Sequence, residues 1–576
     1  MESGERQDFE KSLRDELDAH RRRSTDETVA EVLEEKTWDA ESALLFYTKP
    51  DELHDRLSLL LAHLDSQFTD ADPRQRGNIL QFLCDLSIDL KSALVNWHLV
   101  GELSRSELAG ESARVTSALS ALEERDGSAA SGVHRSLLSL EHERLKCEAA
   151  HDPRAEAEAL LGDSLAEYAR NMAETIEASN FYRLCCEADR ERTELGNDSA
   201  SYLRHAMRVG CSFATTDPAS ILGTWRQSEG EWNDRADGFV RASVSPLEAS
   251  RLAAAGGALD EIPFLDRLAA ELAAEMAFES CRLLRALFLI SGGRQGHVSV
   301  HVSPLHHDDS QRMAGEAEAV YAYLERRLGG RPNVLFKLPA TPAGLNAAER
   351  LTSAGIGVTI TLTFGLFQAL EFAKVLGRGS ALLSCIAFMN GRLAGAVREE
   401  LEELSVPARP ESMQKSAVTV VRRICRELYR GGGSAATVDR GRVRIMVASL
   451  RVYGDDIPDI SELWGVPLIT LVPSVRYAFD RRRREVVRDG VARRSDEKVI
   501  EVLRQSETFR QAWWLPSDPV GKPIRPLGLG FQDAQAVSDW KPVAATLAQF
   551  LQSHRELLRR IAGRVALLNP EPSPPR

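Results

Sequence analysis

The sequence lacks several features of secreted, membrane-spanning and zinc-organised proteins. None of its apolar runs approaches the roughly 18 residues of a membrane span. Its charged beginning, MESGERQDFEKSLRDELDAH, does not fit a secretory signal. The eight cysteines are scattered and form no C-x-x-C pair, so neither a disulfide nor a zinc framework is indicated. We therefore expect a cytoplasmic protein without a membrane partner.

Negative charges outnumber positive ones, and lysine is rare. The formal net charge of −13 argues against bulk attraction to nucleic acid, and we predict no nucleic-acid partner. Arginine greatly outnumbers lysine, and Lys337 is the only lysine between Lys146 and Lys374. A lone lysine in an apolar segment therefore needs its own explanation.

The chain divides into two regions of different texture. Residues 1–175 carry apolar residues at helical spacing with charges between them, and they predict an all-helical packing or interaction region. From residue 176 to 576, short apolar runs alternate with helical stretches. The predicted strands are 181–186, 211–215, 298–302, 334–338, 358–362, 381–387, 443–448 and 467–472. Eight strands alternating with helices predict an α/β fold, a (β/α)₈ TIM barrel closed by C-terminal helices.

Lys337 lies near the end of the strand Val-Leu-Phe-Lys-Leu, where barrel enzymes hold their catalytic groups. Poor solvation in a barrel disfavours the charged ammonium form, and a neutral amine can attack a ketone to form an imine. A lysine at this position can also extend to place its charge in solvent. The strand alone does not separate these two interpretations.

Two further segments offer hydroxyl and carboxyl groups. Thr359, Thr361 and Thr363 alternate along the next strand, so we expect them on one face, where they could hold a water or a substrate hydroxyl. Threonine is also simply favoured in strands. The turn Thr-Thr-Asp-Pro after the second strand presents Asp217, and such a turn often only caps a helix.

Arg392 follows the sixth strand and Arg451 follows the seventh. Two arginines at one barrel mouth can grip a phosphate in forked hydrogen bonds. Either one alone also fits a surface cation. The basic run 481–484 likewise fits a solvated helix face.

The histidine-rich segment VHVSPLHHDD, residues 300–309, raises the question of a metal ion. His297 and His301 share a strand face, but they lie about 13 Å apart, too far to share one ion. His301 could reach an ion together with His306 or His307 and an aspartate. We predict neither a resident metal nor an organic cofactor.

Taken in chain order, these segments resemble the transaldolase family. The shared pattern is a T-T-N-P-like turn, a V-S-x-E-V-like strand, a V-x-x-K-I-P-x-T-like strand followed by G-L, a G-I-x-x-N-x-T-L-like strand followed by Q-A, and two arginine turns. The resemblance covers roughly residues 178–475 and leaves the N-terminal helical region outside.

The resemblance implies roles for individual residues. Lys337 takes the position of the family's Schiff-base lysine, and Thr361 that of its strand-five threonine. Arg392 and Arg451 take the positions of its phosphate-binding arginines. The acid that ends the family's first strand corresponds to Glu187, or alternatively to the aspartate two residues later.

Other positions depart from the family's pattern. Asp217 stands for its turn asparagine, Thr359 for its strand-five asparagine and Ala387 for the serine before the sixth-strand arginine turn. His301 stands for the glutamate that transfers protons through a water. Histidine titrates near neutrality and can act as a general base.

Two functions follow as hypotheses. The first is a Schiff-base enzyme that transfers or cleaves a dihydroxyacetone unit of a ketose phosphate through an imine on Lys337. The second is a catalytically altered barrel that binds a sugar phosphate as a regulatory or interaction protein. In either case residues 1–175 could hold a protein partner or mediate self-association.

Overall fold

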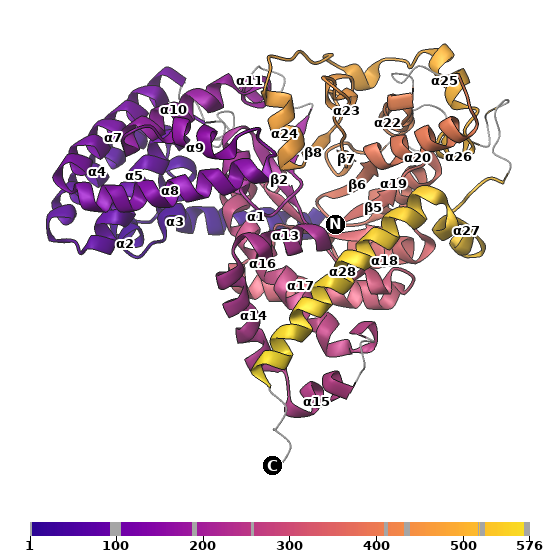
Figure 1. Cartoon of the computed structure of the whole chain (residues 1–576), viewed down its shortest axis with the longest axis horizontal. Helices are drawn as coiled ribbons and strands as arrows, with labels where there is room; N and C mark the ends of the chain where they lie inside the picture. The colour runs from indigo at the N-terminus through magenta and orange to yellow at the C-terminus, as the bar shows by residue number, and fades with distance from the viewer. Residues whose placement is uncertain are drawn as a thin grey trace.

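The computed structural model describes residues 3–92, 105–186, 193–254, 259–407, 413–430, 438–515, 518 and 525–569. Within these residues, the part before the first strand contains helices and no strand. They form a lobe beside the barrel (Figure 1). The lobe consists of α1 (Ser3–Arg21), α2 (Thr25–Leu33), α3 (Thr37–Ser42), η1 (Ala43–Tyr47), η2 (Pro50–Glu52), α4 (Leu53–Asp70), α5 (Pro73–Asp89), α7 (Arg105–Arg125), α8 (Gly127–Cys147), α9 (Pro153–Leu161), α10 (Leu165–Ala178) and α11 (Asn180–Cys186).

Apolar spacing and capping explain these helices. In α4 the buried side chains recur every three or four residues and form one stripe toward the lobe's core. Helix α5 begins at a capping box, in which Asp72 and Gln75 each accept a backbone hydrogen bond from the other, with proline in the first turn. The predicted helical N-terminal region is therefore confirmed in the described residues.

Eight parallel strands close into a barrel in chain order. They are β1 (Glu194–Asn197), β2 (Cys211–Thr215), β3 (His297–His301), β4 (Val334–Pro339), β5 (Gly357–Thr363), β6 (Ser384–Met389), β7 (Val443–Ala448) and β8 (Leu468–Leu471). The predicted TIM barrel is confirmed, and seven of the predicted strands overlap β2 to β8.

The predicted first strand is wrong, because residues 181–186 belong to helix α11. An apolar run this short fits a strand or a buried helix equally well, and its surroundings decide. The Ser179 hydroxyl accepts hydrogen bonds from the backbone N–H groups of Phe181 and Tyr182, and Asp480 accepts one from Asn180. These acceptors satisfy the free donors of a helix N-terminus. The first strand is instead β1, eight residues further on.

Helices surround the barrel between and after the strands. The long connection between β2 and β3 holds several of them. The helices from β1 onward are α12 (Leu203–Arg208), α13 (Pro218–Gln227), α14 (Glu229–Ser243), α15 (Pro246–Ala254), η4 (Leu259–Glu261), α16 (Pro263–Ile290), η5 (Pro304–His306), α17 (Ser310–Leu328), α18 (Pro342–Ser353), α19 (Leu366–Arg378), α20 (Asn390–Glu403), α22 (Ser416–Tyr429), α23 (Pro458–Ser461), α24 (Pro473–Asp480), η6 (Gly490–Ala492), α25 (Glu497–Leu503), α26 (Glu507–Trp513), η7 (Phe531–Asp533), α27 (Ala534–Asp539) and α28 (Lys541–Leu568).

The helical lobe is tied to the barrel by buried ion pairs. Arg208 of α12 contacts Asp85 and Asp89 of α5 at 2.9 and 2.6 Å, and Arg204 pairs with the same two carboxylates.

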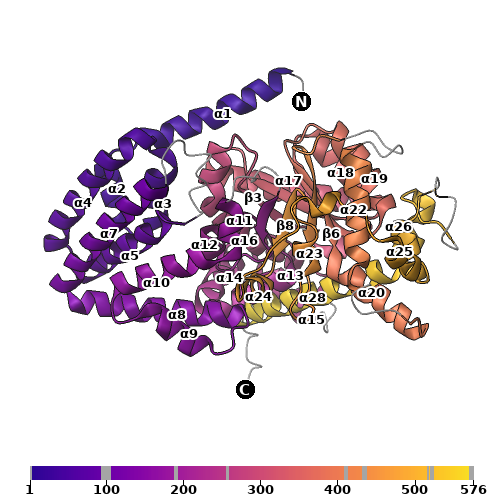
Figure 2. The ribbon, with the colours of Figure 1, turned by 90° about the horizontal axis from the view of Figure 1, so that it is seen from above.

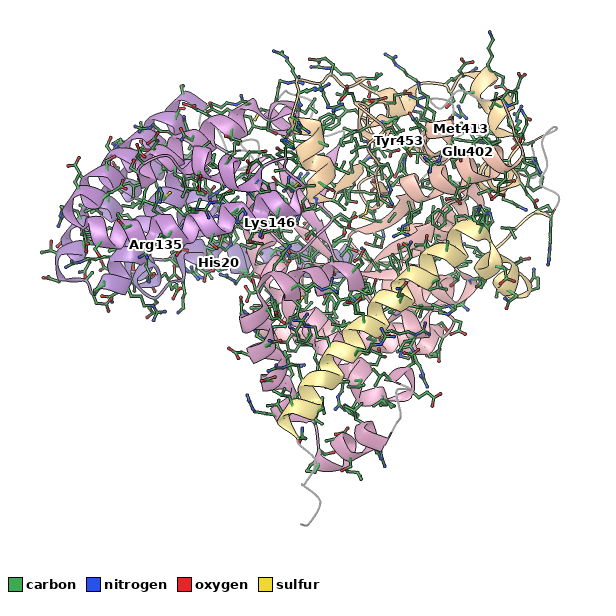
Figure 3. The ribbon with its side chains drawn as sticks, in the orientation of Figure 1. His20, Arg135, Lys146, Glu402, Met413 and Tyr453 are labelled. Carbon is green, nitrogen blue, oxygen red and sulfur yellow. The ribbon has the colours of Figure 1, made fainter. Side chains whose placement is uncertain are left out.

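Helix α1 extends from the lobe toward the barrel, as seen from above in Figure 2. Side chains of the lobe such as Arg135 lie far from Tyr453 on the barrel's opposite side (Figure 3). The lobe therefore covers one flank of the barrel and leaves the other flank uncovered.

Helix α28 runs diagonally across the barrel (Figure 1). It contacts β5, α13, α16 and α20, which belong to different sectors of the barrel wall. Two of its side chains, Leu547 and Phe550, reach the space above the strand ends. Among the described residues, no helix combines the length and apolarity needed to cross a membrane.

Candidate active site

Lys337 lies on β4, close to the carboxyl end of the strand. The strand register places it between His301 of β3 and Thr359 of β5. Leu335, two residues earlier, belongs to the cluster that fills the barrel interior, so alternation along the strand directs Lys337 inward as well. The sequence left open whether this lysine lies in the poorly solvated barrel or extends to solvent. In the structure it is partly buried and lies inside the barrel.

A small cavity lies beside Lys337 at the carboxyl ends of the strands. Its wall includes His301, Asp217 and Thr361, and α28 closes it with Leu547 and Phe550. The cavity volume is about 40 Å³, far below the roughly 300–1,000 Å³ of a typical ligand pocket. Four predicted site residues thus meet at one cavity, which has room for only a few water molecules.

The carboxylates beside the cavity come from the ends of β1 and β2. Asp217 caps α13, where its Oδ1 accepts a hydrogen bond of 2.7 Å from the backbone N–H of Ser220. Asp198 directly follows β1 and accepts a hydrogen bond from the Thr215 hydroxyl. Burial raises the pKa of Asp198, while Lys337 lowers it through its charge. Asp217 therefore serves as a helix cap and also lines the cavity.

Asp198 is a residue that the sequence-based assignment missed. That assignment placed the first-strand acid at Glu187, which lies outside the described residues. Since the first strand is β1, the acid that follows it is Asp198. The signal that could have found it is the Glu-Leu-Gly-Asn-Asp run, a short strand ending in an acid, ahead of the second strand.

His301 is held as a neutral imidazole. Burial, reinforced by the nearby His554, lowers the pKa of His301 to about 3. Its Nδ1 atom is buried without a hydrogen-bond partner in the described residues. The barrel interior disfavours the imidazolium form, so the pKa of His301 departs from the near-neutral value usual for histidine.

The threonines of β5 do not form a continuous ladder. The pairing of β5 with β6 is irregular between Ile360 and Thr363, and Leu362 has a positive φ of 56°. As a result Thr361 and Leu362 line the cavity, whereas the Thr363 hydroxyl donates to the Ile360 carbonyl at 3.2 Å. The Thr359 hydroxyl is buried without a partner in the described residues.

The two arginines lie together outside the wall of the cavity. Arg392 is in the first turn of α20. Burial lowers the pKa of Arg392, and the positive charge of the nearby Arg451 lowers it further. Its guanidinium donates a hydrogen bond to Gln549 and lies over the Phe550 ring, 5.7 Å from the ring centroid. Its Nε donor is buried and has no partner among the described residues. Phe550 thus touches both the cavity and the arginine.

Glycine and glutamine fix the strand ends around the lysine. A Cβ on Gly344 would overlap the Pro339 carbonyl oxygen at the end of β4. The buried Gln368 side chain donates to the carbonyls of Ala340 and Leu362 at 2.9 and 3.1 Å. These contacts join the ends of β4 and β5, so the G-L and Q-A pairs of the sequence pattern have a structural role here.

The fold and this lysine-centred cavity place the chain among (β/α)₈ barrel proteins with a site at the carboxyl ends of the strands. Residues 249–512 match the sequence profile of the transaldolase/fructose-6-phosphate aldolase family. The match leaves out β1 and β2 and the two aspartates that follow them, Asp198 and Asp217.

Individual relatives give the same result. The chain is 30% identical over 207 residues to a transaldolase of Thiobacillus denitrificans, which covers 33% of this chain and 56% of the relative. It is 32% identical over 155 residues to a transaldolase of Frankia alni, 25% of this chain and 40% of the relative. It is 33% identical over 181 residues to transaldolase 1 of Streptomyces coelicolor, 31% of this chain and 40% of the relative. The chain thus spans about half the length of the curated relatives that it matches. Its barrel region, residues 249–512, is therefore similar to the transaldolase family.

Proposed function

We propose that this protein is a Schiff-base enzyme that transfers or cleaves the dihydroxyacetone unit of a ketose phosphate through an imine on Lys337. The observation that carries the proposal is the inward-facing lysine at the barrel mouth, next to carboxylates and a pair of arginines. The match to the family profile and the names of the relatives support the same reaction class.

The reaction would begin with attack of the Lys337 amine on the ketose carbonyl carbon. The resulting carbinolamine loses water and leaves an iminium ion, which serves as an electron sink. The bond between the third and fourth carbons then breaks, and its electron pair moves into the iminium to form an enamine. The fourth carbon leaves as an aldehyde after its hydroxyl loses a proton. The enamine then adds to an acceptor aldehyde, or takes a proton in a simple aldolase, and either step regenerates an iminium ion. Water finally hydrolyses this iminium to release the ketone product and the free Lys337 amine.

Asp198 and His301 would divide the proton transfers. The charge of Lys337 acts on Asp198, and burial raises the pKa of this carboxyl, which suits a group that takes the hydroxyl proton and later returns it. His301 is neutral and adjacent to Lys337 in the register. It would accept a hydrogen bond from the water involved in carbinolamine formation and breakdown. Asp217 and Thr361 would contact the substrate's hydroxyl groups from the cavity wall.

The phosphate would bind between Arg392 and Arg451. A phosphate would offset the mutual repulsion of the two guanidinium groups and take up the free Nε donor of Arg392. Gln549 and Phe550 of α28 now contact Arg392, and the cavity is too small for a ketose phosphate. Substrate entry therefore requires these two side chains to move aside.

A second function is favoured by the exchange of the family's acidic residue for His301. An imidazole with a pKa of about 3 is a weak base. A barrel that kept the lysine and the arginines but lost efficient proton transfer would bind a sugar phosphate without turning it over. Such a protein would act through its helical lobe as a regulatory or interaction protein.

The test is borohydride trapping of the full chain with fructose 6-phosphate, followed by peptide mass spectrometry. We expect the reduced adduct on the peptide that contains Lys337. Lys337→Arg should abolish the adduct. Lys374→Arg, which changes an exposed lysine of α19, is the matched control and should leave it intact.

The outcomes separate the two functions. An adduct at Lys337 together with release of an aldehyde supports the enzyme. An adduct or saturable binding without release, for any acceptor aldehyde, supports the binding protein. An adduct at another lysine contradicts both functions, because each of them assigns imine formation to Lys337.

A further inference from the structure

A second group of titratable side chains lies behind the wall of the lysine cavity. It combines Asp266 of α16, His306 of η5 and Glu316 of α17, all partly buried. One ligating atom from each residue lies within 4.8 Å of the other two. The Nε2 atom of His306 is 2.9 Å from Asp266 Oδ2. Three segments far apart in the sequence thus bring an imidazole and two carboxylates together.

Further side chains hold this group in place from outside. The Ser303 hydroxyl donates to Asp266 Oδ1 at 2.7 Å, and the Ser303 backbone N–H donates to Glu316 at 2.9 Å. His554 of α28, which is only 2% exposed, places its Nε2 atom 2.8 Å from Asp266 Oδ1. Metal-binding carboxylates are commonly oriented by hydrogen bonds of this kind.

The two carboxylates of the group have only histidines as possible countercharges in the described part of the chain. Among the described residues, no lysine or arginine forms an ion pair with Asp266 or Glu316, whose charged neighbours are histidines. Two carboxylates held this close repel each other, and burial away from water increases the cost. A cation between them would remove that cost.

We propose that Asp266, His306 and Glu316 bind a divalent transition-metal ion of the zinc class. Zinc binds histidine nitrogen and carboxylate oxygen at about 2.0–2.2 Å, so ligand atoms around one ion lie at most about 4 Å apart. In this group the ligating atoms lie within 4.8 Å of one another, so small side-chain rotations would bring all three onto one ion. The imidazole ligand favours a transition metal over calcium or magnesium, which prefer oxygen ligands alone.

The ion would have a structural role. None of its three ligands lines the lysine cavity, although the intervening Ser303 and His307 do. The ion would join α16, η5 and α17, and through the bond between Asp266 and His554 it would hold α28 across the barrel mouth. The proposal does not depend on the proposed Schiff-base chemistry.

The experiment uses the full chain, treated with a chelator, desalted and titrated with Zn²⁺ by calorimetry. We expect one Zn²⁺ per chain, confirmed by elemental mass spectrometry after desalting, and a higher unfolding temperature with Zn²⁺ than without. His306→Asn and Glu316→Gln should each weaken binding by about 100-fold or more. His554→Gln should weaken it by about 10- to 100-fold, the usual cost of losing an outer hydrogen-bond partner.

Glu318→Gln is the matched control, because Glu318 lies on the same helix but pairs with Arg350. It should bind Zn²⁺ like the unmodified chain. Circular dichroism of each chelated variant shows whether it has folded. Absence of stoichiometric Zn²⁺ binding by the unmodified chain would overturn the proposal and leave Asp266 as a hydrogen-bonding centre. Equal loss of binding in His307→Asn and His306→Asn would also overturn it, because the ion would then lie in the lysine cavity.

Discussion

At the scale of single residues, the site is defined by charges that act on one another around Lys337. Asp198 lies within the electrostatic reach of Lys337, Asp217 and Arg392. Arg392 in turn lies close enough to Arg451 for their like charges to interact. Around Lys337 the positive and negative charges offset each other, which suits the uncharged carbonyl of a substrate. At the two arginines only positive charges meet, which suits an anionic group at the substrate's other end.

Arg392→Ala and Arg451→Ala should each weaken phosphorylated sugars selectively. A charge-assisted hydrogen bond contributes about 1.5–3 kcal/mol, so each variant should raise the KM or Kd for fructose 6-phosphate by about 10- to 150-fold. Binding of unphosphorylated fructose should change little. Equal losses for both sugars would show that the arginines only support the fold. Arg398→Ala, an exposed arginine on the same helix as Arg392, is the control.

His301→Ala should cost on the order of 10²–10⁴ in turnover and still allow borohydride trapping at long reaction times. Because burial lowers the pKa of His301 to about 3, the imidazole stays neutral as the pH falls from 8 to 5. The pH–rate profile of the unmodified chain should therefore have no limb near pH 6.5 that is due to His301, and His301→Ala should remove none. Such a limb would contradict the neutral imidazole. If only His301→Glu turns over and the unmodified chain does not, the protein is a binding protein.

At the scale of elements, the turn from β6 into α20 shapes the arginine pair. Gly391 donates its backbone N–H to the Ser449 carbonyl at 3.0 Å, so this turn rests directly on the turn after β7. A Cβ at Gly391 would overlap both Arg451 Cγ and the Ser449 oxygen. The close approach of the two turns therefore requires glycine.

Gly391→Ala should displace Arg451 and weaken phosphorylated sugars, with little change for unphosphorylated ones. Steady-state kinetics or calorimetry with both ligands measures the difference. Gly395→Ala is the control, because it lies on the same helix and a Cβ there meets nothing within 4 Å. A Gly391→Ala protein with unchanged affinity for fructose 6-phosphate would contradict the proposed position of the phosphate.

At the scale of the whole molecule, the helical lobe and the barrel share a buried ionic interface. Asp89 is fully buried and accepts hydrogen bonds from Arg204 and Arg208 at 2.7 and 2.6 Å. The buried Arg476 similarly joins Asn197 of β1 to Glu148 at the end of α8. Since these bonds reach β1 and the barrel helices α12 and α24 directly, the lobe is part of the barrel's support and is available to a partner only on its outer faces.

Asp89→Asn should destabilise the protein strongly, because the buried guanidinium of Arg208 and the partly buried one of Arg204 lose a shared countercharge. Removal of one member of a buried ion pair costs about 3–5 kcal/mol, which thermal or urea unfolding measures. Limited proteolysis should then release lobe fragments first. Asp163→Asn, an isosteric change at an exposed carboxylate that forms no ion pair among the described residues, should have little effect. A small change in Asp89→Asn would show that the lobe is held by its apolar contacts alone.

The sequence by itself determined the barrel and its central lysine. Strands such as β4 and β5 carry their own apolar pattern, and a side chain's face in a strand follows from its position in that strand. Motif spacing was therefore enough to bring Lys337, His301, Asp217 and Thr361 to one barrel mouth. These are properties of short segments, which a reader of the sequence sees directly.

Only the tertiary structure decided the features that depend on contacts between distant segments. The run 181–186 became a helix because Ser179 and Asp480 cap it, and this moved the first-strand acid to Asp198. Asp266 meets His306 and His554 across 40 and 288 residues. Burial set the protonation of His301, and α28 set the size of the cavity. Burial, electrostatic surroundings and closure are sums over the whole packed molecule, so no local pattern in the sequence contains them.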